Sequence, residues 1–187
     1  MPELPFKIWK DRIENEIKNL ERLNVLEENS IIHHKNSVEF IINIKALGFV
    51  LKHSKEILDL KPQISHRVFI KINRSFPYPG GIDFSWYSDI FHPNIHPVDS
   101  IFSQKPGTGY ICLNILKTWS RLTDLETTIK ALRMLVENPN PDDPLNYDIC
   151  LRARDFFKQN PIKEFRKRYG FKEKEEQHKE EIIIVDD

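Results

Sequence analysis

Cysteine is scarce in this sequence, and structures that need several cysteines are excluded with it. Cys112 and Cys150 are the only two, too few for a disulfide scaffold and without the C-x-x-C spacing of a structural zinc site. Glycine-rich phosphate loops are also missing, and no apolar run reaches the roughly 18 residues of a membrane span. We therefore expect a soluble protein of a reducing compartment, cytoplasmic and in a eukaryote also nuclear, with no bound metal or cofactor.

An excess of charge of one sign is missing as well. Lys and Arg number 28, as do Asp and Glu, so the sequence lacks the basic excess expected of a nucleic-acid binder. What the sequence does contain is 40% hydrophobic residues, including twelve Phe, in 187 residues, enough to bury the core of one domain. We expect a monomer whose partners are other proteins, with no nucleic acid and no membrane.

The spacing of apolar residues changes along the chain from helical to alternating and back to helical. Helical spacing predicts an amphipathic first helix, and alternating runs rich in branched residues predict three or four antiparallel strands. RSFPYPGG, with two prolines and two glycines, predicts a loop. This order predicts an α+β fold with helices set against an antiparallel sheet. The helices are expected at residues 5–23, 125–138, 146–159 and 161–169, and the strands at 38–44, 47–52, 68–72 and 82–87.

The segment from 91 to 145 holds the residues that point to chemistry. A lone cysteine stands in GYICLNIL, with FHPN upstream and a tryptophan and ENPNPDDPLN downstream. Its neighbours Ile111 and Leu113 are typical of a buried thiol, whereas Gly107, Gly109 and Pro106 favour an exposed loop. One thiol among carboxamides, without an evident base or metal partner, favours acyl transfer through a thioester over hydrolysis.

Four motifs in this order resemble those of the ubiquitin-conjugating enzymes, the E2 proteins that carry ubiquitin or a ubiquitin-like protein as a thioester. They are His92-Pro93-Asn94, the ICLNIL sequence around Cys112, Trp119, and the PNPDDPL sequence of residues 139–145. The resemblance is best from residue 76 to 169. It implies the UBC fold over residues 1–170, with an N-terminal helix, a four-stranded antiparallel meander, an irregular active-site segment and C-terminal helices. Residues 171–187 would form a charged extension that ends in IIIVDD.

The resemblance implies an E2 transferase that accepts its cargo from an E1 enzyme on Cys112 and passes it to a substrate lysine, usually with an E3 ligase. ATP would be used upstream, by the E1. In this scheme Cys112 is the nucleophile, Asn94 donates to the oxyanion, and Asp143 orients the incoming amine. Supporting roles in the active site are implied for His92, Pro93, Asn114 and Leu145. Contacts with E1 or E3 are implied for Lys10, Tyr78, Pro79, Ser120 and Arg121.

Other interpretations of the same residues remain open. Asn94 is equally suited to brace a loop, and His92 to fasten the turn that Pro93 stiffens. Asp142 is interpreted as a cap for the helix expected from residue 146, and Cys150 as a core residue. At the level of the whole protein, the alternatives are a catalytically inactive E2-like binding module and a cysteine hydrolase that uses His92 with Cys112.

The sequence also departs from the family's pattern. His92 and Cys112 lie twenty residues apart, a longer interval than is usual in that family, and the loops FPYPGG and SRLT differ at the surface that contacts E3. The abbreviated hairpin around residues 56–64 is compatible with a divergent or prokaryotic member. The CLNIL and PLN sequences are similar to members that act in neddylation, although ubiquitin is the first expectation. IIIVDD resembles a SUMO-interacting motif, or else it folds back on the protein's own sheet.

Overall fold

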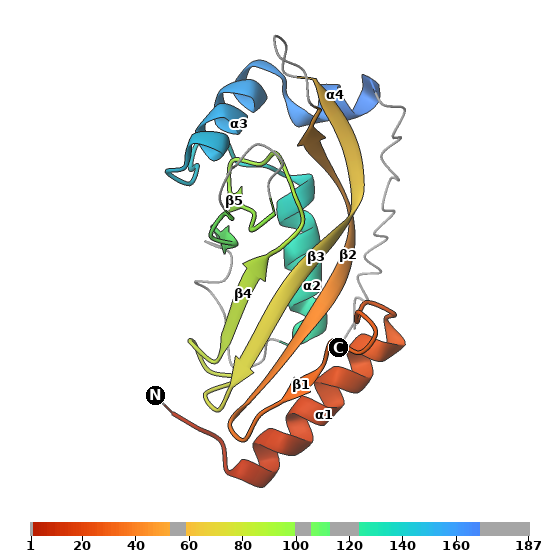
Figure 1. Ribbon diagram of the computed structural model, residues 1–187, viewed down its shortest axis with the longest axis vertical. Coiled ribbons are helices and arrows are strands. Elements are labelled where there is room, and N and C mark those ends of the chain that lie inside the picture. The colour runs from red at the N-terminus through yellow and green to blue at the C-terminus, as the bar shows by residue number, and fades with distance from the viewer. Residues whose placement is uncertain (1, 53–58, 100–105, 113–123, 169–187) are drawn as a thin grey trace, which may run out of the picture.

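The computed structural model describes residues 2–52, 59–99, 106–112 and 124–168. The described residues form an elongated molecule in which helix α1 lies at one end and helices α3 and α4 at the other (Figure 1). The elements are α1 (Phe6–Arg22), β1 (Ile32–His33), β2 (Ser37–Leu51), β3 (Leu60–Asn73), β4 (Ile82–Trp86), β5 (Ile95–His96), β6 (Tyr110–Ile111), α2 (Leu125–Glu137), α3 (Asp148–Gln159) and α4 (Ile162–Arg168).

Two antiparallel sheets are present among the described residues. The larger has four strands in the order β1-β2-β3-β4, so each strand pairs with its neighbour in the chain, and β5 pairs with β6 in the smaller one. The predicted α+β fold, with an N-terminal helix, a four-stranded meander and C-terminal helices, is therefore confirmed. Among the described residues, no helix has the length and apolar character needed to cross a bilayer.

Strand β2 is one long strand where the sequence predicted two. The register of its pairing with β3 shifts between Lys45 and Gly48 because β2 carries one extra residue there. Even-numbered residues such as Ile44 point to the main core before the shift, whereas residues 48–51 are all buried after it, with Phe49 and Leu51 in a second apolar cluster. The extra residue interrupts the alternation, and for this reason the sequence pattern suggested a break.

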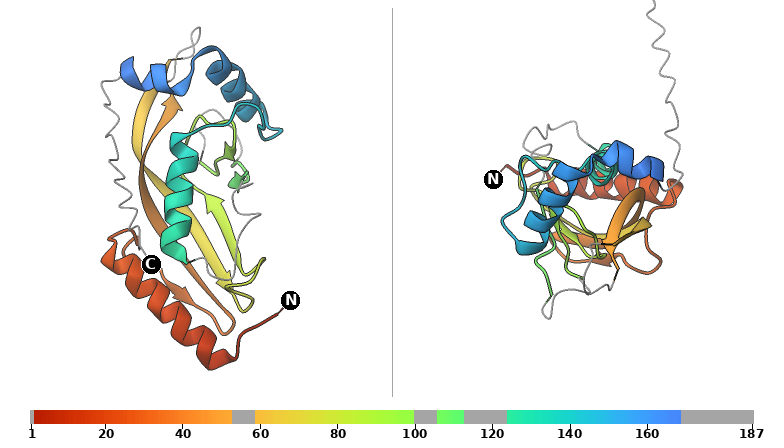
Figure 2. Two further views of the ribbon diagram at one scale, coloured as in Figure 1. Left: turned by 180° about the vertical axis from the view of Figure 1, so that it is seen from behind. Right: turned by 90° about the horizontal axis from the view of Figure 1, so that it is seen from above.

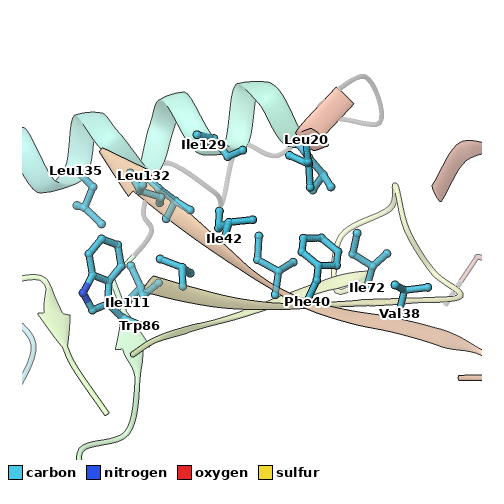
Figure 3. Packing of buried hydrophobic residues seen from close by; sticks show 14 of the residues in the cluster. Leu20, Val38, Phe40, Ile42, Ile72, Trp86, Ile111, Ile129, Leu132 and Leu135 are labelled. Carbon is cyan, nitrogen blue, oxygen red and sulfur yellow. The ribbon is translucent and has the colours of Figure 1, made fainter. Parts of the chain in front are cut away.

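The main core lies between the inner face of the sheet and helices α1 and α2. Helix α2 crosses this face (Figure 2), and its side chains meet those of the three longer strands in one layer (Figure 3). Phe40, Ile42 and Trp86 are fully buried in it, as is Leu132 of α2. At the far end of the same sheet a second cluster packs beneath α3 and α4. It comprises Phe49, Leu51, Leu60, Phe91, Ala153, Phe157 and Phe165.

The predicted helices are present, with small differences at their ends. Helix α2 begins where expected because the Asp124 side chain accepts a hydrogen bond from the Thr127 N–H at 2.7 Å. Helix α3 begins at Asp148, two residues later than expected, after the N-cap residue Tyr147. Buried Glu16 of α1 accepts from the Leu125 N–H at 3.0 Å and so joins α1 to the start of α2; burial raises the pKa of this carboxyl.

Candidate active site

Cys112 directly follows β6 and is partly exposed. Its backbone N–H donates to the Asn94 carbonyl at 2.8 Å, which continues the β5–β6 pairing and fixes the cysteine beside the HPN motif. The thiol opens on a groove of about 210 Å³. The groove is lined by Asn94, Cys112, Met134, Leu135, Asn138, Asn140 and Asp143. The fold therefore brings the three residues with predicted catalytic roles to one groove.

Cys150 is a contrasting thiol in the same chain. It is fully buried in α3, its Sγ donates to the Ile95 carbonyl at 3.3 Å, and burial raises its pKa to about 12. A thiol held in its protonated form is a poor nucleophile. The interpretation of Cys150 as a core residue is confirmed.

His92 is sealed inside the protein and bonded through both ring nitrogens. Its Nδ1 accepts from the Asn94 N–H at 3.0 Å, so the proton of the neutral ring is at Nε2, which donates to the Leu135 carbonyl at 3.0 Å. That carbonyl lies in the last turn of α2, where it also accepts a longer hydrogen bond from the Asn138 N–H at 3.3 Å. Burial lowers the pKa of His92 to about 3. In this arrangement neither ring nitrogen is available to take a proton from Cys112.

The side-chain amide of Asn94 joins the HPN motif to the NPNPDDP segment. Its Nδ2 donates to the carbonyls of Asn140 at 3.0 Å and of Asp143 at 2.8 Å. Its Oδ1 accepts from the Asn140 N–H at 2.8 Å, and the residue is only 3% exposed. The amide thus braces the loop beside Cys112, and both of its N–H bonds are in use. Donation to an oxyanion, which stays a prediction, requires one of them to be released.

The NPNPDDP segment carries Asp143 to the groove, and Leu145 directly follows this segment. The Asp143 side chain is exposed and lines the groove, while the Leu145 N–H donates to the Pro93 carbonyl at 2.8 Å. Asp142 lies before the N-cap of α3, which has no side-chain cap, and its carboxylate pairs with Lys158 at 3.3 Å. The interpretation of Asp142 as a helix cap is therefore wrong.

The remaining predicted site residues lie elsewhere. Lys10 is exposed on α1 and pairs with Glu14 at 3.8 Å, and Tyr78 lines a groove against the same helix. Pro79 is exposed in the loop beside it. Helix α1, which carries Lys10 and one wall of the groove at Tyr78, lies at one end of the molecule (Figure 1). Asn114, Trp119, Ser120, Arg121 and the IIIVDD sequence are outside the described residues.

Sequence reasoning missed several residues around the groove. Met134 and Asn138, at the end of α2, line it, and His96 stacks on Tyr147 just beyond it. Met134 is 59% exposed, so its place in the helical pattern gave no sign of a role. In the described ranges, no group of three His, Cys, Asp or Glu side chains is placed to hold a metal ion.

A four-stranded meander crossed by a helix, with an accessible cysteine held against an HPN turn, defines the UBC class of proteins. The chain belongs to the ubiquitin-conjugating enzyme family, because residues 63–170 match the family model described as "Ubiquitin-conjugating enzyme".

Curated relatives have several names within this family. The chain is 45% identical over 60 residues to Protein PEROXIN-4 of Arabidopsis thaliana, covering 32% of each protein. It is 29% identical over 110 residues to ubiquitin-conjugating enzyme E2-23 kDa of Triticum aestivum, covering 56% of this chain and 53% of that protein. It is 40% identical over 72 residues to the NEDD8-conjugating enzyme UBC12 of Saccharomyces cerevisiae, covering 36% and 33%. The chain thus spans about a third to a half of these relatives.

Two solved structures share the fold. The E2 domain of a Toxoplasma gondii ubiquitin conjugating enzyme has a TM-score of 0.55 at 22% identity, covering 81% of this chain and 88% of that one. Ubc12 of S. cerevisiae has a TM-score of 0.51 at 23% identity, covering 84% and 74%. At these identities the likeness supports the fold alone.

Proposed function

We propose that this protein is an active E2 enzyme, which accepts ubiquitin or a ubiquitin-like protein from an E1 as a thioester on Cys112 and transfers it to a lysine. One observation carries the proposal. In a chain of this family, Cys112 is a partly exposed thiol that shares a groove with Asn94 and Asp143. Cys150, the other thiol, is sealed in the core.

The proposed reaction has two acyl transfers and no redox step. First, the Cys112 thiolate attacks the thioester carbonyl of the E1-bound cargo, forms a new C–S bond and releases the E1 thiolate. A neutral lysine amine then attacks the Cys112 thioester, forms an amide bond, gives up a proton and releases the Cys112 thiolate. Neither step requires a cofactor in this protein, because ATP is spent when the E1 forms the first thioester.

The groove offers groups suited to the second transfer. A free lysine has a pKa of about 10.4, so it must lose a proton before it can attack at neutral pH. Asp143 at the groove wall is placed to orient the amine and accept that proton. The apolar side chains of Met134 and Leu135 line the same groove and would favour the neutral amine by displacing water. Leu145 is expected to exclude water from the adjoining side of the groove.

The proposed partners are an E1, a ubiquitin-like cargo, an E3 ligase and a substrate protein. The names of the relatives, which include a ubiquitin-conjugating enzyme and a NEDD8-conjugating enzyme, support a cargo of this kind without separating its members. The two cysteines, which form no disulfide, suit a reducing cytoplasmic compartment. Lys10 on α1 and the loop with Tyr78 and Pro79 are the proposed docking points for E1 and E3.

A second candidate is a catalytically inactive E2-like binding module. The observation that favours it is the Asn94 amide, whose two donors are both occupied by loop carbonyls. If that brace never opens, the groove lacks its oxyanion donor, and the protein would bind cargo without transferring it. The two candidates differ in whether a covalent adduct forms.

The test is to incubate the protein with E1, ATP and each member of a panel of ubiquitin-like cargoes. The active enzyme gives a band that dithiothreitol removes, and lysine added afterwards discharges it. Cys112→Ala should abolish the band, and Cys112→Ser should give either no adduct or an ester that resists reductant. Cys150→Ser is the matched control and should charge normally if it folds, which its thermal unfolding checks.

The outcomes separate the candidates. An adduct that survives in Cys112→Ala would place the acyl group elsewhere and overturn the proposal. Absence of an adduct with every E1 and cargo pair, together with binding of cargo in a sedimentation or titration assay, would favour the binding module.

A further inference from the structure

His96 joins three segments around the groove. It lies at the end of β5, two residues after Asn94, and pairs across the small sheet with Tyr110, two residues before Cys112. Its ring stacks on Tyr147 with the centroids 3.9 Å apart and the planes 10° from parallel. Tyr147 ends the segment that carries Asp143 and Leu145. The ring therefore touches both the cysteine-bearing sheet and the segment on the acceptor side of the groove.

The third segment is the long interval between the HPN motif and the cysteine. Thr108, near its end, donates its backbone N–H to His96 Nδ1 at 3.2 Å, and the Thr108 Oγ1 lies 2.8 Å from the same nitrogen. The Tyr110 N–H donates to that Oγ1 at 3.2 Å, while the Thr108 N–H is directed to the imidazole nitrogen. His96 Nδ1 is thus an acceptor, and the ring is neutral with its proton at Nε2.

Backbone hydrogen bonds fix the two ends of this interval. The Val98 N–H donates to the Trp86 carbonyl and the Gly107 N–H to the Val98 carbonyl, both at 2.8 Å, while the Trp86 N–H donates to the Gly109 carbonyl at 2.9 Å. A Cβ at Gly107 would lie 1.8 Å from the Pro97 oxygen, so only glycine allows this approach. The backbone on either side of Thr108 is therefore held in place beside His96.

The segment of residues 140–147, on the side of the groove where the substrate lysine is proposed to approach, is held against the HPN motif at two places. Asn94 binds it at Asn140 and Asp143, and the Leu145 N–H donates to the Pro93 carbonyl. Beyond Leu145 the next contact is the stack of Tyr147 on His96. The segment from Asp143 to Tyr147 thus runs from a hydrogen-bonded brace at Pro93 and Asn94 to an aromatic stack at His96.

We propose that His96 is a positioning residue, which through Tyr147 and Thr108 holds the acceptor side of the groove at a set distance from Cys112. The inference rests on the proposed function, since its consequence is the rate at which an amine reaches the thioester. Without the stack, the segment from Asp143 to Tyr147 keeps its backbone hydrogen bonds to Asn94, Pro93 and Leu151 but loses its side-chain contact with the small sheet. Asp143 and Leu145 then sample more positions, and fewer of them suit attack.

The first experiment loads the protein with cargo, removes the E1 and follows discharge to free lysine over a range of lysine concentrations. His96→Ala and Tyr147→Ala should each slow discharge by about three- to tenfold, with the rate of charging by E1 within about twofold of wild type. Tyr147→Phe keeps the ring and should restore discharge to near the wild-type rate. The double variant His96→Ala/Tyr147→Ala should be no slower than His96→Ala alone, because the His96 variant already removes the stack together with the contacts to Thr108.

The matched control is Tyr87→Ala. Tyr87 stacks on Phe69 with the planes 6° from parallel and the centroids 5.8 Å apart, on the outer face of the sheet, so its loss tests the general effect of removing a stacked ring. Discharge should stay near the wild-type rate. Slowing of charging and discharge together, in step with a lower melting temperature, would make His96 merely structural. Unchanged discharge, or additive effects in the double variant, would also overturn the proposal.

A second experiment needs neither E1 nor cargo and so separates failure of this inference from failure of the proposed function. Alkylation by iodoacetamide, read by mass spectrometry, reports access to Cys112, and buried Cys150 serves as the internal reference. His96→Ala and Tyr147→Ala should alter Cys112 alkylation by about threefold or more, and Tyr147→Phe should not. If wild type never charges, the proposed function fails, and equal alkylation in all variants then overturns the positioning role as well.

Discussion

The sheet core and the rim around Cys112 are stabilised by different means. In the core, apolar side chains from α1, α2 and three strands pack in one layer, and each has several neighbours (Figure 3). At the rim, two buried polar residues, His92 and Asn94, each bond to specific backbone atoms. The stability of the core depends on the apolar area that it buries, whereas the rim depends on individual hydrogen bonds that no neighbouring group can replace.

This difference suggests why the rim is suited to chemistry. A packed layer tolerates changes among apolar residues of similar volume, but an unpaired buried donor or acceptor costs about 1–3 kcal/mol. The rim can therefore hold a cysteine and a carboxylate in defined places without covering them. Four predictions test the contrast, in order of expected effect on the free energy of unfolding.

The largest effect is expected in the core. Phe40→Ala removes a fully buried ring from β2 and should lower the free energy of unfolding by about 3–5 kcal/mol, measured by urea denaturation. The matched control is Ile41→Ala, on the opposite face and only partly buried, for which we expect a loss of about 1 kcal/mol. Equal losses for the two variants would show that the inner face does not dominate stability.

The second prediction concerns pH and the buried histidines. Burial lowers the pKa of His92 to about 3 and of His66 to about 4, so both are neutral in the folded protein, whereas an unfolded imidazole binds a proton below about pH 6.5. The contribution of the two neutral histidines to stability is therefore fully present above that pH. It is lost as the pH falls toward their pKa values in the folded protein. Between pH 7 and pH 5 each should cost about 2 kcal/mol of unfolding free energy.

Denaturation series at several pH values check this second prediction. His92→Gln and His66→Gln should each flatten the pH dependence, although they also lower stability at pH 7. His33→Gln, which removes an exposed ring of β1, serves as the control and should leave the slope unchanged. A wild-type slope that none of the buried-site variants alters would assign the acid sensitivity to other groups.

The third prediction concerns the Asn94 brace. Asn94→Asp replaces the two N–H donors by an oxygen that faces the carbonyls of Asn140 and Asp143, and it should cost about 1–3 kcal/mol. Hydrogen exchange at the Leu145 amide should accelerate, because the loop is released. Asn73→Asp, at the end of β3 where the amide makes an exposed hydrogen bond to the Gly80 carbonyl at 2.9 Å, should cost less. If the two variants cost the same, burial of the brace is not what makes it strong.

The smallest effect is expected at Asp142. Its pair with Lys158 is exposed on both sides, so Asp142→Asn should change the free energy of unfolding by less than about 0.5 kcal/mol. A helix cap at this position would cost about 1 kcal/mol on removal. A measured loss of that size would restore the capping role and contradict the observed start of α3.

The sequence predicted the core better than the rim, for a physical reason. Helical spacing from residue 125 and alternation from Val38 to Ile44 report burial directly, and the helices and the meander follow from them. The predicted break in β2 was wrong because one extra residue changes the alternation without ending the strand. Tertiary pairing with β3 carries the strand past an irregularity that a local pattern interprets as a boundary.

At the rim, the motifs located the residues but not their bonds. The resemblance to E2 enzymes placed Cys112, Asn94 and Asp143 together, and they share the groove. The occupation of both Asn94 donors depends on carbonyls 46 and 49 residues away, which no spacing along the chain reveals. His96 escaped notice for the same reason, since its partners Thr108 and Tyr147 become neighbours only through the fold.

The ladder that joins Trp86, Val98, Gly107 and Gly109 makes the segment between Asp99 and Pro106 a natural place to graft foreign sequence. Because the two ends of this loop are already closed by the backbone, lengthening it adds only a slowly growing entropic cost. An insertion that leaves these backbone hydrogen bonds intact is expected to leave the Cys112 backbone in place. The length of the chain between Asp99 and Pro106 can thereby vary without a change in the position of Cys112.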